Sequence, residues 1–143
     1  MNKNTSKIIA FNNYAREMKG KRVDFDWAYN YQCVDLIRDY AKKNNYPEIT
    51  TRWNAIELWN KWLGNWYTRV HNTMAWVPPT WSIILYSIWT YWHIAITGRS
   101  TIVWCEILEQ NWETWNGLWL GWDAITISRN FYRDCLGWFV PNM

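Results

Sequence analysis

The order of two hydrophobic patterns constrains the fold of this chain most strongly. Before the segment VPPT at residues 77–80, apolar residues recur at helical spacing over residues 6–19, from Cys33 onward, and over residues 54–62. After it come short β-branched and aromatic runs, at residues 81–88, 91–97, 101–110, 124–128 and 135–141. Helices followed by strands with short turns predict an α+β fold, with N-terminal helices packed on an antiparallel β-sheet.

Length, hydropathy and charge narrow the class of protein further. The chain has 143 residues, half of them hydrophobic, which predicts a single folded domain over residues 1–143. Its apolar runs are too short to cross a bilayer. A net charge of +3 without a Lys/Arg block gives no argument for nucleic acid, but it favours loose attraction to an anionic surface such as a cell wall. The first residues lack the apolar core and cleavage site of a secretory signal peptide.

The three cysteines differ in their surroundings. No C-x-x-C spacing occurs, which argues against a structural zinc site. Cys105 and Cys135 lie in apolar runs, so we expect buried small hydrophobic residues there. Cys33 instead lies in DFDWAYNYQCVDLIRDY, among aspartates, where a helix is predicted to begin. The free N–H groups and dipole of a helix N-terminus favour the thiolate, which is the nucleophilic form of cysteine.

A thiol nucleophile needs a base, and the chain has two histidines. His71 lies in a polar connector, where we expect it to be exposed. His93 lies in a predicted strand among apolar residues, either as a catalytic base or on the solvent side of a half-buried sheet. Glu109 and Asn111 are two residues apart on the next predicted strand, so they share a face and can orient such a histidine. The order of cysteine, histidine, and acid or amide is that of papain-like enzymes.

The aspartates around Cys33 have the spacing of a calcium loop. When Asp24 is taken as position one, Asp26 is position three and Asp35 is position twelve. Ala28 and Asn30 fall at positions five and seven, where main-chain carbonyls can serve as ligands. The loop lacks the glycine of an EF-hand and no long helix precedes it. The alternative is a polar turn, with Asp35 in the dipole-favoured first turn of a helix.

Four segments in order, DFDWAYNYQCVDL, YWHIAI, EQNW and YRDCLGWFVP, resemble the CHAP domain (cysteine, histidine-dependent amidohydrolase/peptidase). The similarity is to the CHAP domains of phage endolysins and related hydrolases of Gram-positive cell walls, and it covers roughly residues 8–141. It implies a papain-like fold and an N-acetylmuramoyl-L-alanine amidase or cross-bridge endopeptidase. It also implies Cys33 as nucleophile and His93 as base, with Glu109 and Asn111 orienting His93 and the substrate.

The same resemblance has implications for ligands and location. It implies a structural calcium ion held by Asp24, Asp26, the carbonyls of Ala28 and Asn30, and Asp35. The expected partner is bacterial peptidoglycan, with neither nucleic acid nor membrane involved, and the expected state is a monomer. The protein would be made in the host cytoplasm without a signal peptide and would act on the cell wall after release.

The tryptophans depart from the CHAP pattern in one direction. The chain has 15 tryptophans and 6 glycines, whereas glycine is normally about 7% of residues. Trp27, Trp81 and Trp92 stand where CHAP domains usually have glycine, and further tryptophans lie in a loop that is commonly glycine-rich. One hypothesis is that the source reads UGA codons as glycine. The other is a lineage with an aromatic, wall-binding surface.

Two alternative functions follow from the same residues. The first is a non-catalytic, tryptophan-rich module that binds cell-wall glycan, because exposed indoles stack well on sugar faces. The second retains the thiol chemistry but acts on a protein substrate. Clearing of cell walls separates an enzyme from a binding module, and release of dye from casein or from peptidoglycan separates the two substrates.

Overall fold

The computed structural model describes residues 2–21, 33–47, 49, 55–61, 66–73, 76–87, 93–110 and 126–142. Among these residues three helices come first: α1 (Lys3–Met18), α2 (Cys33–Lys43) and α3 (Ala55–Lys61). The strands follow as β1 (Tyr67–His71), β2 (Ile83–Tyr86), β3 (His93–Ser100), β4 (Trp104–Glu109), β5 (Thr126–Phe131) and β6 (Cys135–Pro141). The predicted α+β class, with helices before an antiparallel sheet, is confirmed. Cys33 opens α2 as predicted.

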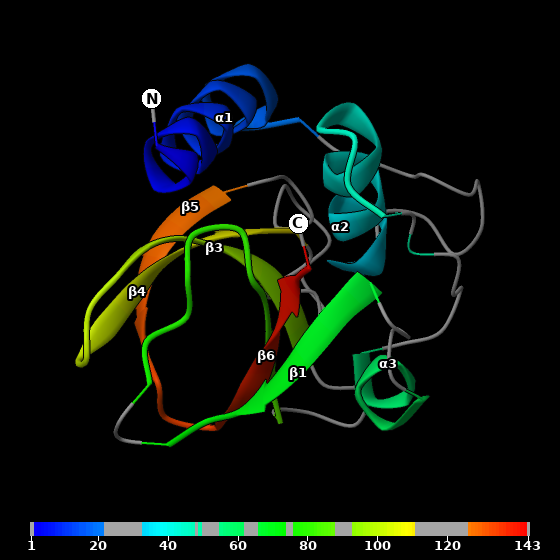
Figure 1. Ribbon diagram of the computed structural model, residues 1–143, viewed down its shortest axis with the longest axis vertical. Helices are drawn as coiled ribbons and strands as arrows, with labels where there is room; N and C mark the ends of the chain where they lie inside the picture. The colour runs from blue at the N-terminus through cyan, green and yellow to red at the C-terminus, as the bar shows by residue number, and fades with distance from the viewer. Residues whose placement is uncertain are drawn as a thin grey trace.

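The strands form one six-stranded sheet in the order β1-β6-β2-β3-β4-β5, and every neighbouring pair is antiparallel. The sheet curls strongly, and α1 and α2 lie outside the curl (Figure 1). Strands β2, β3 and β4 follow one another in the chain and are neighbours in the sheet, whereas β6 is inserted between β1 and β2. The strand that starts at His93 is therefore central in the sheet.

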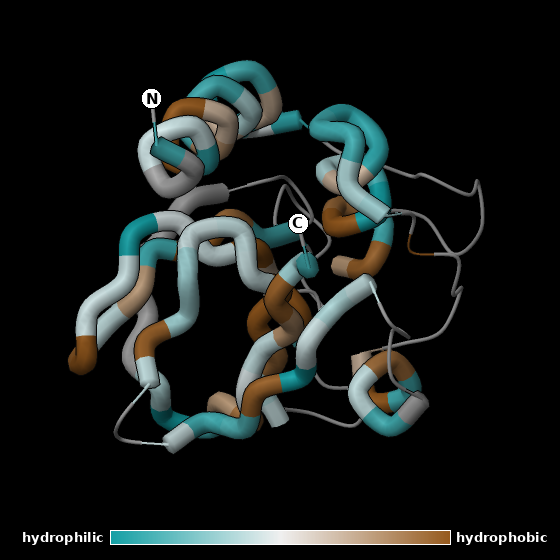
Figure 2. The backbone as a smooth tube through the Cα atoms, in the orientation of Figure 1, coloured by the Kyte–Doolittle hydropathy of each residue, from teal (hydrophilic) through white to brown (hydrophobic). Residues whose placement is uncertain are grey.

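Both faces of the central strands are buried. Alternate residues such as Ile83 and Leu85 pack in a cluster with α1 and α2, whereas Ile84 and Tyr86 pack in a second cluster across the sheet. This alternation follows from the period of two in a β-strand. Figure 2 shows the same division along α2, where hydrophobic turns lie beside the sheet and hydrophilic turns lie away from it. The packing holds α2 against β3.

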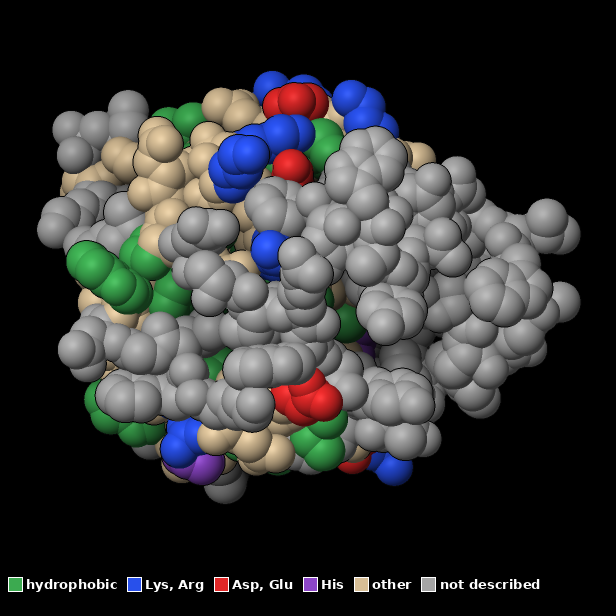
Figure 3. Space-filling model, turned by 90° about the vertical axis from the view of Figure 1, so that its right-hand side faces the viewer, with side chains coloured by type: hydrophobic (Ala, Val, Ile, Leu, Met, Phe, Trp, Pro, Cys, Tyr) green, Lys and Arg blue, Asp and Glu red, His purple; other side chains and the backbone are tan. Residues whose placement is uncertain are grey.

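Polar contacts join α1 to α2 at their outer ends. The Tyr14 hydroxyl donates to Asp39 at 2.7 Å, and Lys43 lies 3.4 Å from Asp39 and 3.8 Å from Glu17. Positive and negative side chains gather at the top of the molecule in Figure 3, over these helices. Exposed ion pairs of this kind contribute little to stability, about 0–1 kcal/mol each. The apolar packing of α2 is therefore the stronger constraint on its position.

The structure corrects the prediction for His71. The segment predicted as a polar connector is β1, and His71 is its last residue, paired with Gly137 of β6. The strand was missed because it is an edge strand with several polar, exposed residues, so its hydrophobic alternation is weak. The expected exposure of His71 itself is confirmed. Cys105 and Cys135 are buried, also as predicted.

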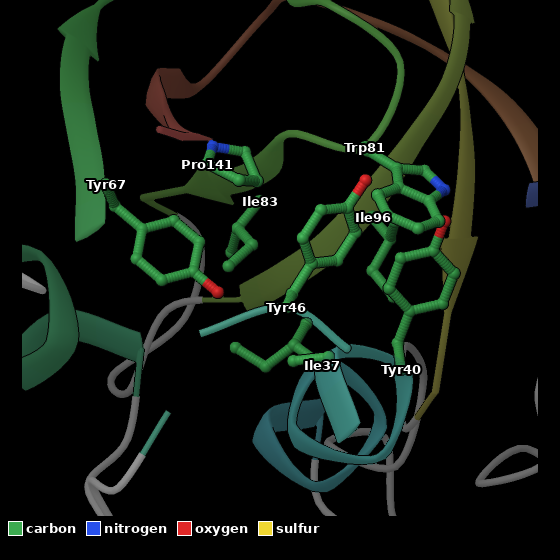
Figure 4. Close-up of a pocket in the computed structure, with 9 residues that line it drawn as sticks. Ile37, Tyr40, Tyr46, Tyr67, Trp81, Ile83, Ile96 and Pro141 are labelled. Atoms are coloured by element: carbon green, nitrogen blue, oxygen red, sulfur yellow. The ribbon is translucent and has the colours of Figure 1, made fainter. Parts of the chain in front are cut away.

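Trp81 has a backbone conformation that favours glycine. Its φ is 83°, in the left-handed region, although the side chain is 94% buried at a relative exposure of 6%. Its indole makes T-shaped contacts with the rings of Tyr40 and Tyr46, between α2 and the sheet (Figure 4). Trp59 and Trp138 are also buried, but neither has a positive φ. The glycine-like character predicted for position 81 therefore extends to its backbone.

Candidate active site

Cys33 is presented by the N-terminus of α2. It is the first residue of the helix, is partly exposed and forms no disulfide. The next turns of α2 bury their apolar side chains against the sheet, Leu36 and Ile37 almost completely. Because this face packs on β3, Cys33 is held close to His93, the first residue of that strand. The residues before Cys33, from 22 to 32, lie outside the described part of the chain.

His93 begins β3 and is only 1% exposed. Its Nε2 lies 3.1 Å from Oε2 of Glu109, the last residue of the neighbouring strand β4. Glu109 is itself 3% exposed, so the pair is shielded from water. The alternative that His93 lies on the solvent side of a half-buried sheet is wrong, because both faces of β3 are covered.

His93 also makes a side-chain hydrogen bond with Cys33, and the two partners together set its charge. Burial lowers the pKa of His93, whereas the hydrogen bonds with Cys33 and Glu109, and the negative charge of each, raise it to about 9. The imidazole is therefore protonated at neutral pH when both partners are present. A cysteine, a histidine and a carboxylate joined by hydrogen bonds can perform nucleophilic attack by the sulfur and proton transfer by the imidazole.

Two residues with side-chain amides, Gln110 and Asn111, follow Glu109 in the sequence. Asn111, the predicted second orienting residue, lies outside the described residues. Gln110 is described and fully buried next to Glu109. No role was predicted for Gln110, although a polar amide directly after an apolar strand is a signal that the sequence offers. A buried amide requires hydrogen-bond partners, and the side chain or backbone of Gln110 does have an interaction partner.

The predicted calcium ligands fall mostly outside the described residues. Asp24, Asp26, Ala28 and Asn30 all lie there. Asp35 is described, lies in the first turn of α2 and is 3% exposed. Within the described ranges, no group of three or more His, Cys, Asp or Glu side chains is arranged to hold a metal ion. A carboxylate so deeply buried is compatible with a cation ligand, but Asp35 already has an interaction partner.

The chain resembles known endolysins in sequence and in fold. No protein-family model matches the chain. The chain is 29% identical over 136 residues to endolysin PlyTW of Staphylococcus phage Twort, a match that covers 90% of this chain. Among solved structures it resembles the wild-type endolysin LysIME-EF1, with a TM-score of 0.72 and 20% identity over 99% of this chain. It also resembles Ly7917, with a TM-score of 0.63 and 16% identity over 92% of this chain.

The structural similarities establish the fold, and the sequence similarity to PlyTW shows a distant homology to a phage endolysin. The chain spans 29% of the length of PlyTW, 65% of LysIME-EF1 and 60% of Ly7917. It therefore corresponds to part of each of these proteins. In the described segments, none of the helices is both long and apolar enough to cross a bilayer.

Proposed function

We propose that the chain is a thiol-dependent peptidoglycan hydrolase of the CHAP type, cutting an amide bond of the cell-wall peptide. The observation that carries the proposal is the buried His93, which makes hydrogen bonds with both Cys33 and Glu109. Distant homology to phage endolysins supports the cell wall as the substrate. The bond would be that of an N-acetylmuramoyl-L-alanine amidase or of a cross-bridge endopeptidase.

In the proposed mechanism Cys33 attacks the scissile carbonyl carbon as a thiolate. The carbonyl oxygen becomes an oxyanion, for which the backbone N–H of Cys33 and Gln32 are the candidate donors. His93 gives its proton to the leaving amine, the C–N bond breaks, and a thioester remains on Cys33. Water then attacks the thioester, His93 accepts a proton from it, and the acid product leaves as the thiolate re-forms. Glu109 and Asn111 orient His93 and the substrate.

The two roles of His93 require its pKa to change during the cycle. In the free enzyme Cys33 raises this pKa by its hydrogen bond and its negative charge, so the ring carries the proton that the amine needs. In the thioester Cys33 has no charge, and burial then lowers the pKa of His93 with only Glu109 opposing it. The neutral ring can accept the proton of the attacking water. Acylation itself therefore converts the acid into a base.

We also propose that the chain binds a calcium ion with a structural role. Asp24, Asp26, the carbonyls of Ala28 and Asn30, and Asp35 would hold it. When bound, it would supply positive charge that fixes the loop before Cys33. The chemistry of bond cleavage stays with the side chains of the chain, and Asp35 would connect the loop to the first turn of α2.

Clearing of Gram-positive cell walls tests the enzymatic function. Wild-type protein should lower the turbidity of a wall suspension, and Cys33→Ala should leave it flat. Cys135→Ala is a matched control, because it removes a buried thiol that takes no part in the proposed chemistry. Equal clearing by Cys33→Ala and wild type would refute the mechanism. Mass spectrometry of released muropeptides then separates amidase from endopeptidase.

A second function is favoured by two exposed indoles. Trp66 and Trp76 are 66% and 65% exposed, as expected for a non-catalytic module that binds cell-wall glycan. Such a module would sediment with walls while leaving their turbidity unchanged. In either function we expect a monomer that is made in the host cytoplasm and acts on the wall after release.

A further inference from the structure

A hollow of about 220 Å³ lies away from the candidate active site. It is lined by Asn72, Thr73, Trp76, Ile102 and Tyr132. Ile102 is in the turn between β3 and β4, at the left of Figure 1, whereas α2 with Cys33 lies at the right. His93 and Ser100 are opposite ends of β3, and at about 3.3 Å per residue they are roughly 20 Å apart. Any ligand in the hollow is thus separate from the bond that is cut.

Hydrogen bonds fix the walls of this hollow. The Tyr132 hydroxyl donates to the carbonyls of Thr101 and Trp104, which ties the β5–β6 turn to the β3–β4 turn. The Asn72 side-chain amide donates to the carbonyl of Cys135 at 3.1 Å, which ties the end of β1 to the start of β6. Three separate chain segments are therefore held together before any ligand arrives. Such preorganisation favours binding, because little order must be gained.

The lining combines apolar surfaces with polar groups. Trp76 is 65% exposed and Ile102 is 75% exposed, and the β3–β4 turn is hydrophobic at its tip in Figure 2. Thr73 adds an exposed hydroxyl, and Asn72 adds an amide oxygen. Unlike Trp81, Trp76 is not among the residues with positive φ, so its backbone accommodates a large side chain without strain. An indole face beside hydroxyl and amide groups matches a sugar ring, which has apolar C–H faces and a polar edge.

We propose that this hollow is a non-catalytic binding site for a pyranose ring of the peptidoglycan glycan strand. The inference rests on the proposed function, which makes the substrate a polymer with many sugar rings. One polymer can occupy the hollow and present a peptide to Cys33 at the same time. The second contact then raises the effective concentration of scissile bonds near the active site.

Calorimetric titration with the peptide-free tetramer of N-acetylglucosamine tests the site directly. The full chain should bind the tetramer, and Trp76→Ala should weaken binding by about three- to tenfold, the usual worth of an aromatic contact. Trp66→Ala is the matched control, since Trp66 is 66% exposed but does not line the hollow. Ile102→Ser should also weaken binding. Thermal melts of all three variants should match wild type, because these side chains are exposed.

Several outcomes would overturn the inference. They are an absence of tetramer binding, an equal effect of Trp76→Ala and Trp66→Ala, or concentration-dependent self-association lost in Ile102→Ser without any glycan binding. The proposed hydrolase function is tested independently of the glycan site. Cys33→Ala should abolish wall clearing and leave the tetramer affinity unchanged. Tetramer binding that depends on Trp76, in a protein that never clears walls, would support the glycan site and refute the hydrolase.

Discussion

Replacing Trp81 by glycine should leave the protein about as stable as it is now, although the indole is buried. Three features of Trp81 are unfavourable. A left-handed backbone at φ 83° costs a non-glycine residue about 1–2 kcal/mol. The buried indole Nε1 has no hydrogen-bond partner among the described residues, which costs about 1–3 kcal/mol. Its ring centroid is 3.7 Å from that of Tyr46, closer than the usual 4.5–7 Å, and such overpacking costs about 1–3 kcal/mol.

The favourable side of Trp81 has a similar size. Truncating a buried tryptophan to alanine typically costs about 3–5 kcal/mol, and glycine adds about 0.5–1 kcal/mol of backbone entropy. The unfavourable terms removed amount to about 3–8 kcal/mol. We therefore expect Trp81→Gly to change the free energy of unfolding by less than about 2 kcal/mol in either direction. Trp138→Gly, at a residue that is 1% exposed and has no positive φ, should lose about 4–6 kcal/mol.

Urea unfolding of glycine and alanine variants at both positions provides the assay. At position 81, glycine should be more stable than alanine by about 1 kcal/mol, because alanine keeps the left-handed strain. At position 138, alanine should be the more stable by about 0.5–1 kcal/mol. The same order at both positions, or an equal loss in Trp81→Gly and Trp138→Gly, would refute the reasoning. If glycine is the more stable residue at position 81 and alanine the more stable at position 138, the result favours the hypothesis that UGA is read as glycine in the source.

The remaining predictions concern charge, packing and the calcium ion. Glu109→Gln should lower the pKa of His93, move the alkaline limb of kcat/KM from about pH 9 to lower pH, and reduce kcat by up to about 10⁴-fold; an unmoved limb would argue against the pairing. Because the pKa of His93 is raised from 6.5 in the folded chain, its proton stabilises the fold fully below about pH 6.5, and melts should show this contribution lost through about pH 9. Gly137→Ala should lose about 1–3 kcal/mol in a denaturant titration, since an added Cβ would meet the carbonyl oxygen of Val70. Chelation should lower Tm and activity together if calcium is bound, whereas values indifferent to chelator would exclude it.

Local sequence features fixed the positions of several parts before any packing was known. The helical repeat and the polar segment before it placed Cys33 at the start of α2. The β-branched runs placed His93 and Glu109 on successive strands, and β3 and β4 are indeed neighbours. These predictions succeeded because helix starts and hairpin-connected strands depend on residues close together in the chain. Roles for Asn111 and the aspartates stay predictions.

Long-range packing decided what the local patterns could not. Strand β1 forms because Tyr67 pairs with Pro141 and the residues after Tyr67 continue that register. These partners lie at opposite ends of the strand-forming part of the sequence. His93 is buried because both faces of the curled sheet are covered. An alternating sequence pattern predicts a sheet with only one covered face. Its raised pKa depends on Cys33 and Glu109 arriving from two other elements.

The sequence by itself thus indicated which residues are candidates for the chemistry and on which kind of element Cys33, His93 and Glu109 lie. Only the tertiary structure decided that a helix N-terminus and two strand ends meet, and that His93 is buried there. It also decided that Trp81 lies in a left-handed backbone conformation, whereas Trp76 does not. The physical reason is that hydrogen bonding within elements is local, whereas burial and electrostatic coupling are properties of residues that are neighbours only after folding.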